Sequence, residues 1–368
     1  FMKIKKNIIF FLANFNQGGA GFSVTNMCKH IDKKKYNIYV ISLLNNYYKK
    51  ELKKYCKKIY IIDKNKVIFS LNYIVKNILS KFDKKNTIFI SNINYTNVVS
   101  IFFLKIIYSY KLILIERTPL QELNYAYGVI DYIKKKIIKI LIIFLYKKAD
   151  LIIANAQKIA NDIKKLSNKK SEFIYPFTLK KISKNIPKKN YKKKFNILSI
   201  GRFSVEKNLE EIIRSVGSIN DNNICLKLLG TGLKIDNLRL IAKSYKINIK
   251  FCKFSNKKEI QLLKEANLYI NSSHFEGFPN GVLKALDFNV PVIASKSHGG
   301  IYEILMNGRG GVLYNQGDEV DLSKKIIEIK KNYIFHLNKT HLHKKKLTKF
   351  LLKKNVLKFH KLLDGILD

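Results

Sequence analysis

The stretch NSSHFEGFPNGVLKAL, residues 271–286, decides how the rest of this chain is interpreted. It follows a short apolar run at residues 268–270 and precedes another, VPVIAS, at residues 290–295. This order is typical of a strand, a binding loop, a helix and a second strand, and open α/β sheets place their ligands at such loops. The loop carries one carboxylate, Glu276, and glycines that let backbone N–H groups approach an anion at a helix N-terminus. We therefore expect a ligand site in this stretch.

The same stretch resembles the donor-sugar site of retaining glycosyltransferases of family 4, which have the two-domain GT-B fold. In that family it reads Glu-Gly-Phe-Pro, and a second Glu follows eight residues after the first. Here Glu276 holds the first position and Lys284 holds the second. The resemblance implies that Glu276 contacts hydroxyls of the donor sugar. It also implies that a run of backbone faces the donor phosphate, namely Gly277, Phe278, Pro279, Asn280, Gly281 and Val282.

Lys284 is a departure at a binding position. The family's second Glu accepts hydrogen bonds from the ribose hydroxyls, whereas an ammonium group can only donate. The loss of such a pair costs about 1–3 kcal/mol. Asp287, one helical turn further on, could pair with Lys284 or replace part of the lost acceptor. The family pattern also predicts that a Lys284→Glu variant binds UDP more tightly and is more stable, because the helix dipole favours negative charge in a first turn.

A basic turn, GRFSVEKNL at residues 201–209, follows the first apolar run of the second half. The family's counterpart has Gly-Arg and then Glu-Lys before a helix. A nucleoside-diphosphate leaving group builds up negative charge as the sugar bond breaks, and fixed cations are needed where that charge develops. Arg202 and Lys207 are therefore candidates for catalysis together with Glu276. The alternative for both cations is a solvated basic turn.

Two later turns match the family in their order and spacing. Gly230 and Gly232 form a Gly-x-Gly turn after the next apolar run. Lys253 and Phe254 lie in the segment whose backbone meets the nucleotide base in the family. The resemblance implies that these four residues and Gly201 contribute to donor binding.

The first half carries a looser resemblance. Gly18 and Gly19 stand at the first strand-to-helix turn, where the family has a glycine loop that approaches the sugar or diphosphate. Many members place a His near the reacting carbon, but the corresponding region here holds Glu116 and Arg117. These two residues suit a subgroup that acts on amino sugars, on the acceptor side. A buried salt bridge at a strand end is an equal alternative.

Short apolar runs alternate with helix-like stretches along both halves, which predicts an α/β fold with doubly wound parallel sheets. With the resemblance, this becomes a GT-B fold of two Rossmann-like domains that face a cleft. Strands are expected near residues 4–12, 38–43, 59–62, 87–91, 112–116, 151–154, 195–200, 224–229, 249–251, 268–271, 290–294 and 311–314. The expected parts are an acceptor-binding domain (1–177), a linker (178–194), a nucleotide-sugar-binding domain (195–335) and a basic helical tail (336–368).

The net charge of +44 raises the question of nucleic-acid binding. Of 70 basic residues only five are Arg, whereas readers of phosphates and bases favour the bidentate guanidinium. Nucleic acid is therefore disfavoured as a partner, and attraction to an anionic membrane surface is preferred. The segment at residues 134–148 has basic flanks around apolar residues. It could lie in a membrane interface, but we interpret it as a core helix.

The sequence lacks several motifs that would indicate a metal site, a disulfide framework or a membrane span. The four cysteines are scattered without metal spacing, which favours reduced thiols in a cytoplasmic protein. The sequence contains no Asp-x-Asp, the signature of a divalent-metal diphosphate clamp, so neither a metal nor another cofactor is expected. No apolar run reaches the length of a transmembrane helix, and residues 1–12 are interpreted as a first strand instead of a signal peptide.

The resemblance implies retaining, metal-independent transfer of a hexose or N-acetylhexosamine from a nucleoside-diphosphate sugar, with UDP as the expected nucleotide. The acceptor would be a glycan or a lipid-linked glycan of the cell envelope, and the enzyme would be peripheral at the inner face of the plasma membrane. A first alternative is a catalytically weakened relative that binds sugar nucleotide or glycan, which Lys284 supports. A second is a basic nucleic-acid-binding protein.

Overall fold

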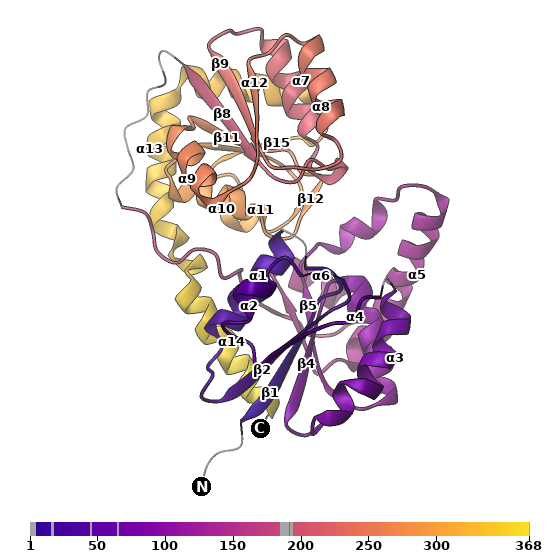
Figure 1. The fold of residues 1–368 in the computed structure, drawn as a ribbon. Coiled ribbons are helices and arrows are strands. Elements are labelled where there is room, and N and C mark those ends of the chain that lie inside the picture. Colours follow the sequence, from indigo (N-terminus) through magenta and orange to yellow (C-terminus); the bar gives the residue numbers. More distant parts are fainter. Residues whose placement is uncertain are drawn as a thin grey trace. The chain divides into compact units, whose positions relative to one another are not determined.

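The chain forms two compact α/β units (Figure 1). The computed structural model describes residues 5–15, 18–44, 46–64, 66–184, 191 and 194–367. The N-terminal unit consists of Phe1–Lys180 and Phe350–Asp368, and the C-terminal unit is Lys181–Lys349. Each unit has its own parallel sheet, as the alternation of apolar runs predicts.

The described residues of the N-terminal unit form a seven-stranded parallel sheet in the order β3-β2-β1-β4-β5-β6-β7. Its strands are β1 (Lys6–Phe11), β2 (Tyr36–Ser42), β3 (Lys58–Ile61), β4 (Thr87–Asn92), β5 (Lys111–Glu116), β6 (Leu151–Ala154) and β7 (Glu172–Phe173). Its helices are α1 (Gly19–His30), α2 (Lys49–Leu52), α3 (Val67–Asn77), η1 (Leu79–Lys81), α4 (Asn94–Ser100), the π-helix η2 (Ile101–Ile107), η3 (Leu120–Asn124), α5 (Val129–Leu145), η4 (Tyr146–Lys148), α6 (Gln157–Ser167) and α14 (Leu352–Leu367). The strand order reverses between β1 and β4, and such switch points are where open sheets bind ligands.

The C-terminal unit repeats this design. In the described residues its parallel sheet has the order β10-β9-β8-β11-β13-β15, and β12 pairs with β14 in a separate ribbon. Its strands are β8 (Phe195–Ile200), β9 (Ile224–Leu229), β10 (Ile249–Cys252), β11 (Leu268–Asn271), β12 (Phe275–Glu276), β13 (Val292–Ser295), β14 (His298–Gly299) and β15 (Val312–Tyr314). Its helices are η5 (Val205–Lys207), α7 (Leu209–Ile219), α8 (Ile235–Ser244), α9 (Asn256–Glu265), α10 (Asn280–Asp287), α11 (Ile301–Ile304), α12 (Glu319–Lys331) and α13 (Tyr333–Lys344), and η6 (Lys345–Phe350) follows α13. The six strands of the parallel sheet form where the apolar runs predict them, because strands covered on both faces are apolar throughout, whereas β12 and β14 were not expected.

The structure divides the expected C-terminal tail between the two units. Helix α13 belongs to the C-terminal unit, whereas α14 packs into the core of the N-terminal unit. Phe359 and Leu363 of α14 are fully buried there, and burial of each such side chain stabilises the unit by about 1.5–3 kcal/mol. The segment is therefore no separate basic tail. Part of the expected linker, at residues 185–190 and 192–193, lies outside the described residues.

Helix α5 is more exposed than the core helix that the sequence predicts for this segment. Its buried residues are Ile138 and Ile142, and most of its other apolar side chains are exposed. The sequence did not show this because an apolar helix of this length fits either a core or an interface. In the described part of the chain, no helix has the length and hydropathy required to cross a bilayer.

Candidate functional site

The switch point of the C-terminal sheet brings the main candidates together. The strand order reverses between β8 and β11, so the loops that follow these two strands are neighbours. The Ser272 hydroxyl donates a hydrogen bond to the Lys207 carbonyl oxygen at 2.8 Å, and the His274 N–H donates to the Glu206 carbonyl oxygen at 2.9 Å. These two bonds fix the basic turn after β8 against the loop that leads to Glu276.

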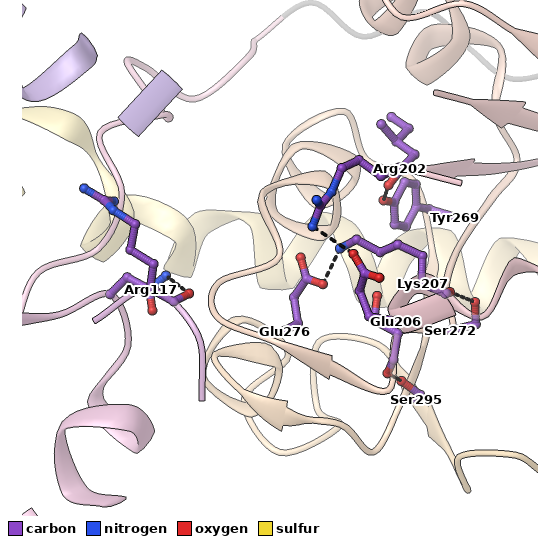
Figure 2. A network of polar contacts seen from close by, with 11 residues as sticks. Arg117, Arg202, Glu206, Lys207, Tyr269, Ser272, Glu276 and Ser295 are labelled. Carbon is purple, nitrogen blue, oxygen red and sulfur yellow. Dashed lines mark hydrogen bonds and ion pairs between the residues drawn. The ribbon is translucent and has the colours of Figure 1, made fainter. Parts of the chain in front are cut away.

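Lys207 and Glu276 form an ion pair at this point (Figure 2). Their side chains are 17% and 16% exposed, so both charges are largely removed from water. The apolar stem of Lys207 lies over Gly201, where an added Cβ would lie 3.4 Å from the lysine Cδ. The removal of either partner would leave the other charge without compensation in a partly dry site, which is costly.

Arg202 has a different environment from Lys207. Its Nη2 donates to Glu206 Oε1 at 2.8 Å, and its side chain is 68% exposed (Figure 2). A pair this exposed contributes little to stability, so the guanidinium group can turn towards an anionic ligand at small cost. The sequence analysis gave Glu206 no role, although its separation of four residues from Arg202 was the available signal.

At positions 230 and 232 only glycine fits, because neighbouring backbone atoms leave no room for a side chain. A Cβ on Gly230 would lie 1.8 Å from the Gly201 carbonyl oxygen, and one on Gly232 would lie 2.3 Å from the Phe203 carbonyl oxygen. The Phe203 N–H also donates to the Thr231 carbonyl oxygen at 2.9 Å. The two glycines thus allow the turns after β8 and β9 to touch, and their contact with a donor stays a prediction.

The loop of residues 277–282 begins helix α10, as expected. Phe278 and Val282 are buried beneath it. A Cβ on Gly281 would lie 2.1 Å from the Tyr269 hydroxyl, so the first turn of α10 rests directly on this tyrosine. Burial raises the pKa of Tyr269, and the charge of Glu276 raises it further, so the hydroxyl stays protonated. Tyr269 is part of the site that the sequence analysis missed.

The remaining donor candidates are more peripheral. Lys253 and Phe254 follow β10, and both are exposed. Pro279 precedes α10 and Asn280 is its first residue.

Lys284 does not pair with Asp287. Its Nζ lies 2.7 Å from Glu259 Oε2 on α9, and the Glu259 side chain is only 7% exposed. Asp287 instead accepts hydrogen bonds from the Ser183 N–H at 2.8 Å and the Ser183 hydroxyl at 2.6 Å. Asp287 is therefore committed to Ser183, and Lys284 balances a buried carboxylate that the sequence analysis did not single out.

In the N-terminal unit, Glu116 and Arg117 lie in separate networks. Glu116 is fully buried and its Oε1 accepts hydrogen bonds from Tyr146 and from Asn97. Burial raises the pKa of Glu116 to about 7 and lowers the pKa of Arg117 to about 10. The hydrogen bonds of the two side chains go to different partners, and a contact of either side chain with the acceptor stays a prediction.

Arg117 keeps a polar environment of its own. It donates to Asn92 Oδ1 at 2.8 and 3.0 Å and to the Ser23 hydroxyl at 2.7 Å. It also lines a small pocket together with Tyr175 and other residues of this unit. Gly18 and Gly19 lie at the start of α1, where an added Cβ would meet open space. These glycines are therefore not required by packing.

Similar solved structures identify the fold of the chain. The crystal structure of Anabaena HepE in complex with UDP and glucose matches 98% of this chain and all of its own, with a TM-score of 0.80 and 16% identity. Sucrose-phosphate synthase from Thermosynechococcus elongatus gives a TM-score of 0.81 at 14% identity, over 98% of this chain and 99% of that one. At these identities the likeness shows the fold, and the fold is GT-B.

The C-terminal unit is also similar in sequence to known glycosyltransferases. The family model described as glycosyl transferases group 1 matches residues 181–346, which is nearly the whole of this unit. An uncharacterized glycosyltransferase of Methanocaldococcus jannaschii is 33% identical over 46% of this chain and 45% of its own length. The Campylobacter jejuni N-acetylgalactosamine-N,N'-diacetylbacillosaminyl-diphospho-undecaprenol 4-alpha-N-acetylgalactosaminyltransferase is 28% identical over 60% of this chain and 62% of its own length. The chain thus spans about half the length of the curated relatives it matches. Its C-terminal unit matches the group 1 glycosyltransferase model, and the fold of the whole chain is GT-B.

The Lys284–Glu259 pair reverses one expectation for the Lys284→Glu variant. The introduced carboxylate would lie beside that of buried Glu259, so we expect the free energy of unfolding to fall by about 1–3 kcal/mol instead of rising. Urea unfolding measures this change, with Lys284→Gln as the control that removes the pair without adding repulsion. The double variant Lys284→Glu/Glu259→Gln should recover stability relative to the single variant. A single variant as stable as the wild type would contradict this account of the pair.

Glu116 predicts a pH dependence of stability. The unfolded state ionises Glu116 near pH 4.5 and the folded state near pH 7, so its contribution to the free energy of unfolding falls as pH rises between these values. Glu116→Gln should therefore gain stability relative to the wild type by about 1–3 kcal/mol between pH 5 and pH 8. Glu211, whose pKa burial also raises to about 7, titrates equally in both proteins and cancels. Urea unfolding at both pH values checks this, and an unchanged difference would contradict it.

Proposed function

We propose that this protein transfers a hexose or an N-acetylhexosamine, with retention of configuration, from a nucleoside-diphosphate sugar to a glycan or lipid-linked acceptor. The observation that carries the proposal is the Lys207–Glu276 pair at the switch point of a group 1 glycosyltransferase domain, with Arg202 beside it. Two cations, Lys207 and Arg202, and the carboxylate of Glu276 lie at this switch point. Open α/β sheets bind their ligands at such points.

The arrangement supports a separate role for each of these side chains in the proposed reaction. The ammonium of Lys207 and the guanidinium of Arg202 would stabilise the negative charge that develops on the departing diphosphate. Glu276 aims Lys207 in the structure and would accept hydrogen bonds from the donor sugar. The departing phosphate oxygen would take the acceptor's proton, so a separate nucleophile–base pair is not required. Gly201, Gly230 and Gly232, which add no side chain at this point, would let the surrounding backbone approach the diphosphate.

The choice of donor and acceptor classes rests on the similar proteins. HepE has been crystallised with UDP and with UDP-glucose, which supports a UDP-sugar as donor. The Campylobacter jejuni relative is named for transfer to a diphospho-undecaprenol-linked sugar, which supports a lipid-linked glycan acceptor. An acceptor of this kind would place the protein at the inner face of the plasma membrane.

One observation favours a second candidate, a weakened relative that binds sugar nucleotides with little turnover. Lys284 offers no acceptor for ribose hydroxyls, and its ammonium is held by Glu259. Donor hydrolysis and transfer assays on the wild-type protein separate the two candidates. Saturable UDP-sugar binding without either reaction would favour the weakened relative.

Arg202→Ala and Lys207→Ala should each reduce transfer by roughly 10²–10³-fold, mostly in kcat, because both cations act on charge that develops in the transition state. Steady-state kinetics with a UDP-sugar measure the loss, and Lys257→Ala, at an exposed lysine of the same unit, serves as the control. Glu276→Ala combined with Lys207→Ala should cost less than the sum of the single losses, since the two side chains act as a pair. Unchanged turnover in both single variants would remove the diphosphate from this turn.

Transfer should persist in EDTA. In the proposed mechanism, Arg202 and Lys207 would supply the positive charge that a divalent ion supplies in other diphosphate sites. The measurement is turnover with and without chelator, followed by addition of Mg²⁺ or Mn²⁺. Complete loss that either ion restores would overturn the metal-independent mechanism.

A further inference from the structure

Helix α5 exposes a continuous apolar stripe on the N-terminal unit. Five aliphatic residues and one phenylalanine of this helix are each more than half exposed, namely Val129, Ile130, Ile133, Ile137, Ile140 and Phe144. Most are separated by three or four residues, so their side chains lie on one side of the helix. Ile138 and Ile142 lie on the opposite side and are buried in the unit. One face of α5 is thus packed, and the other presents aliphatic and aromatic groups to the surroundings.

Lysines flank this stripe on both sides, namely Lys134, Lys136, Lys147 and Lys148, and all four are exposed. Lys134 lies over the Tyr95 ring at 4.8 Å, and Lys136 lies over the Tyr132 ring at 5.3 Å. These lysines keep their charges at the rim while their stems cover apolar surface. The sole acidic residue of α5, Asp131, is paired with Lys135 at 3.1 Å. The face is therefore apolar at its centre and positive at its edges.

The apolar surface continues beyond α5. Phe102, Ile106 and Ile107 of η2 are about half exposed, and Ile68 and Phe69 of α3 are exposed as well. Helices α3 and α5 lie on the same side of the N-terminal sheet as α4, which η2 continues (Figure 1). Exposed apolar area of this extent with a charged rim marks an interaction surface.

We propose that this α5 face docks the protein on an anionic lipid bilayer, with the helix lying flat in the interface. A helix of 17 residues spans about 25 Å, and α5 has the apolar stripe and lysine rim of an interfacial helix. The positive charge of the flanking lysines distinguishes between the two possible partners of this face, a second copy of the chain and a lipid bilayer. A second copy of the chain would bring the four lysines against their equivalents, whereas an anionic bilayer neutralises them and receives the stripe. This surface does not depend on the transfer reaction proposed above.

Tryptophan fluorescence gives a direct test, because the chain contains no Trp. In the full-length Ile137→Trp variant, the single Trp should shift its emission to shorter wavelength on addition of phosphatidylglycerol-containing vesicles. Phosphatidylcholine vesicles should have little effect. Phe335→Trp, at an exposed position of α13 in the C-terminal unit, should not shift and serves as the control. Absence of the shift at position 137 would overturn the proposal.

Vesicle sedimentation then separates the two contributions to binding. The triple variant Ile133→Ser/Ile137→Ser/Ile140→Ser and the quadruple variant Lys134→Gln/Lys136→Gln/Lys147→Gln/Lys148→Gln should each bind anionic vesicles at least tenfold more weakly than the wild type. The matched controls alter exposed residues of the C-terminal unit, Leu240, Val320 and Phe335 to Ser, and Lys243, Lys257, Lys324 and Lys331 to Gln. Circular dichroism confirms folding of each variant.

Two outcomes would overturn the proposal. The first is equal binding of the α5 variants and their matched controls, which would assign membrane attraction to the overall charge. The second is a change from dimer to monomer in light scattering without a change in vesicle binding, which would assign the α5 face to contacts between two copies. Because vesicle binding needs no donor sugar, failure here leaves the proposed transfer reaction untouched.

Discussion

The reversal of strand order between β8 and β11 is the constraint on which the site depends. Parallel strands end at the same edge of a sheet, and the reversal places two loops side by side there without a helix between them. The basic turn after β8 and the loop after β11 therefore meet, although Lys207 and Glu276 are 69 residues apart in the sequence. Hydrogen bonds from Ser272 and His274 then hold the loops at a fixed distance, and Lys207 can reach Glu276.

The few acidic residues of this lysine-rich chain are placed where they organise cations. Glu276 pairs with Lys207, Glu206 pairs with Arg202, and Glu259 pairs with Lys284. The three pairs differ in how far their side chains are exposed to solvent, and the exposure of a pair determines how easily its partners separate. The exposed Arg202–Glu206 pair is easily exchanged for a ligand, whereas the buried Glu259 requires a permanent partner. A buried carboxylate that is balanced by a cation and an exposed cation that can exchange its partner thus occur in the same unit.

The N-terminal unit buries polar groups and exposes apolar ones. Glu116 and Arg117 are buried within hydrogen-bond networks made with Tyr146, Asn97, Asn92 and Ser23. Meanwhile α5 turns isoleucines and a phenylalanine outward. Hydrophobicity alone predicts neither arrangement. Burial of a polar group is tolerated once the group is hydrogen-bonded, and a large exposed apolar stripe marks an interaction surface.

The sequence by itself determined the fold class, the position of most strands and the order of the glycine-rich and basic turns that follow them. It could do so because buried parallel strands are short apolar runs, and because glycines and charged residues mark the loops that follow them. Tertiary structure alone decided the partner of Lys284, the commitment of Asp287 to Ser183 and the packing of α14 into the N-terminal unit. It also decided which face of α5 is covered. These outcomes depend on side chains that are distant in sequence, such as Glu259 and Lys284, and no local pattern specifies which of them meet.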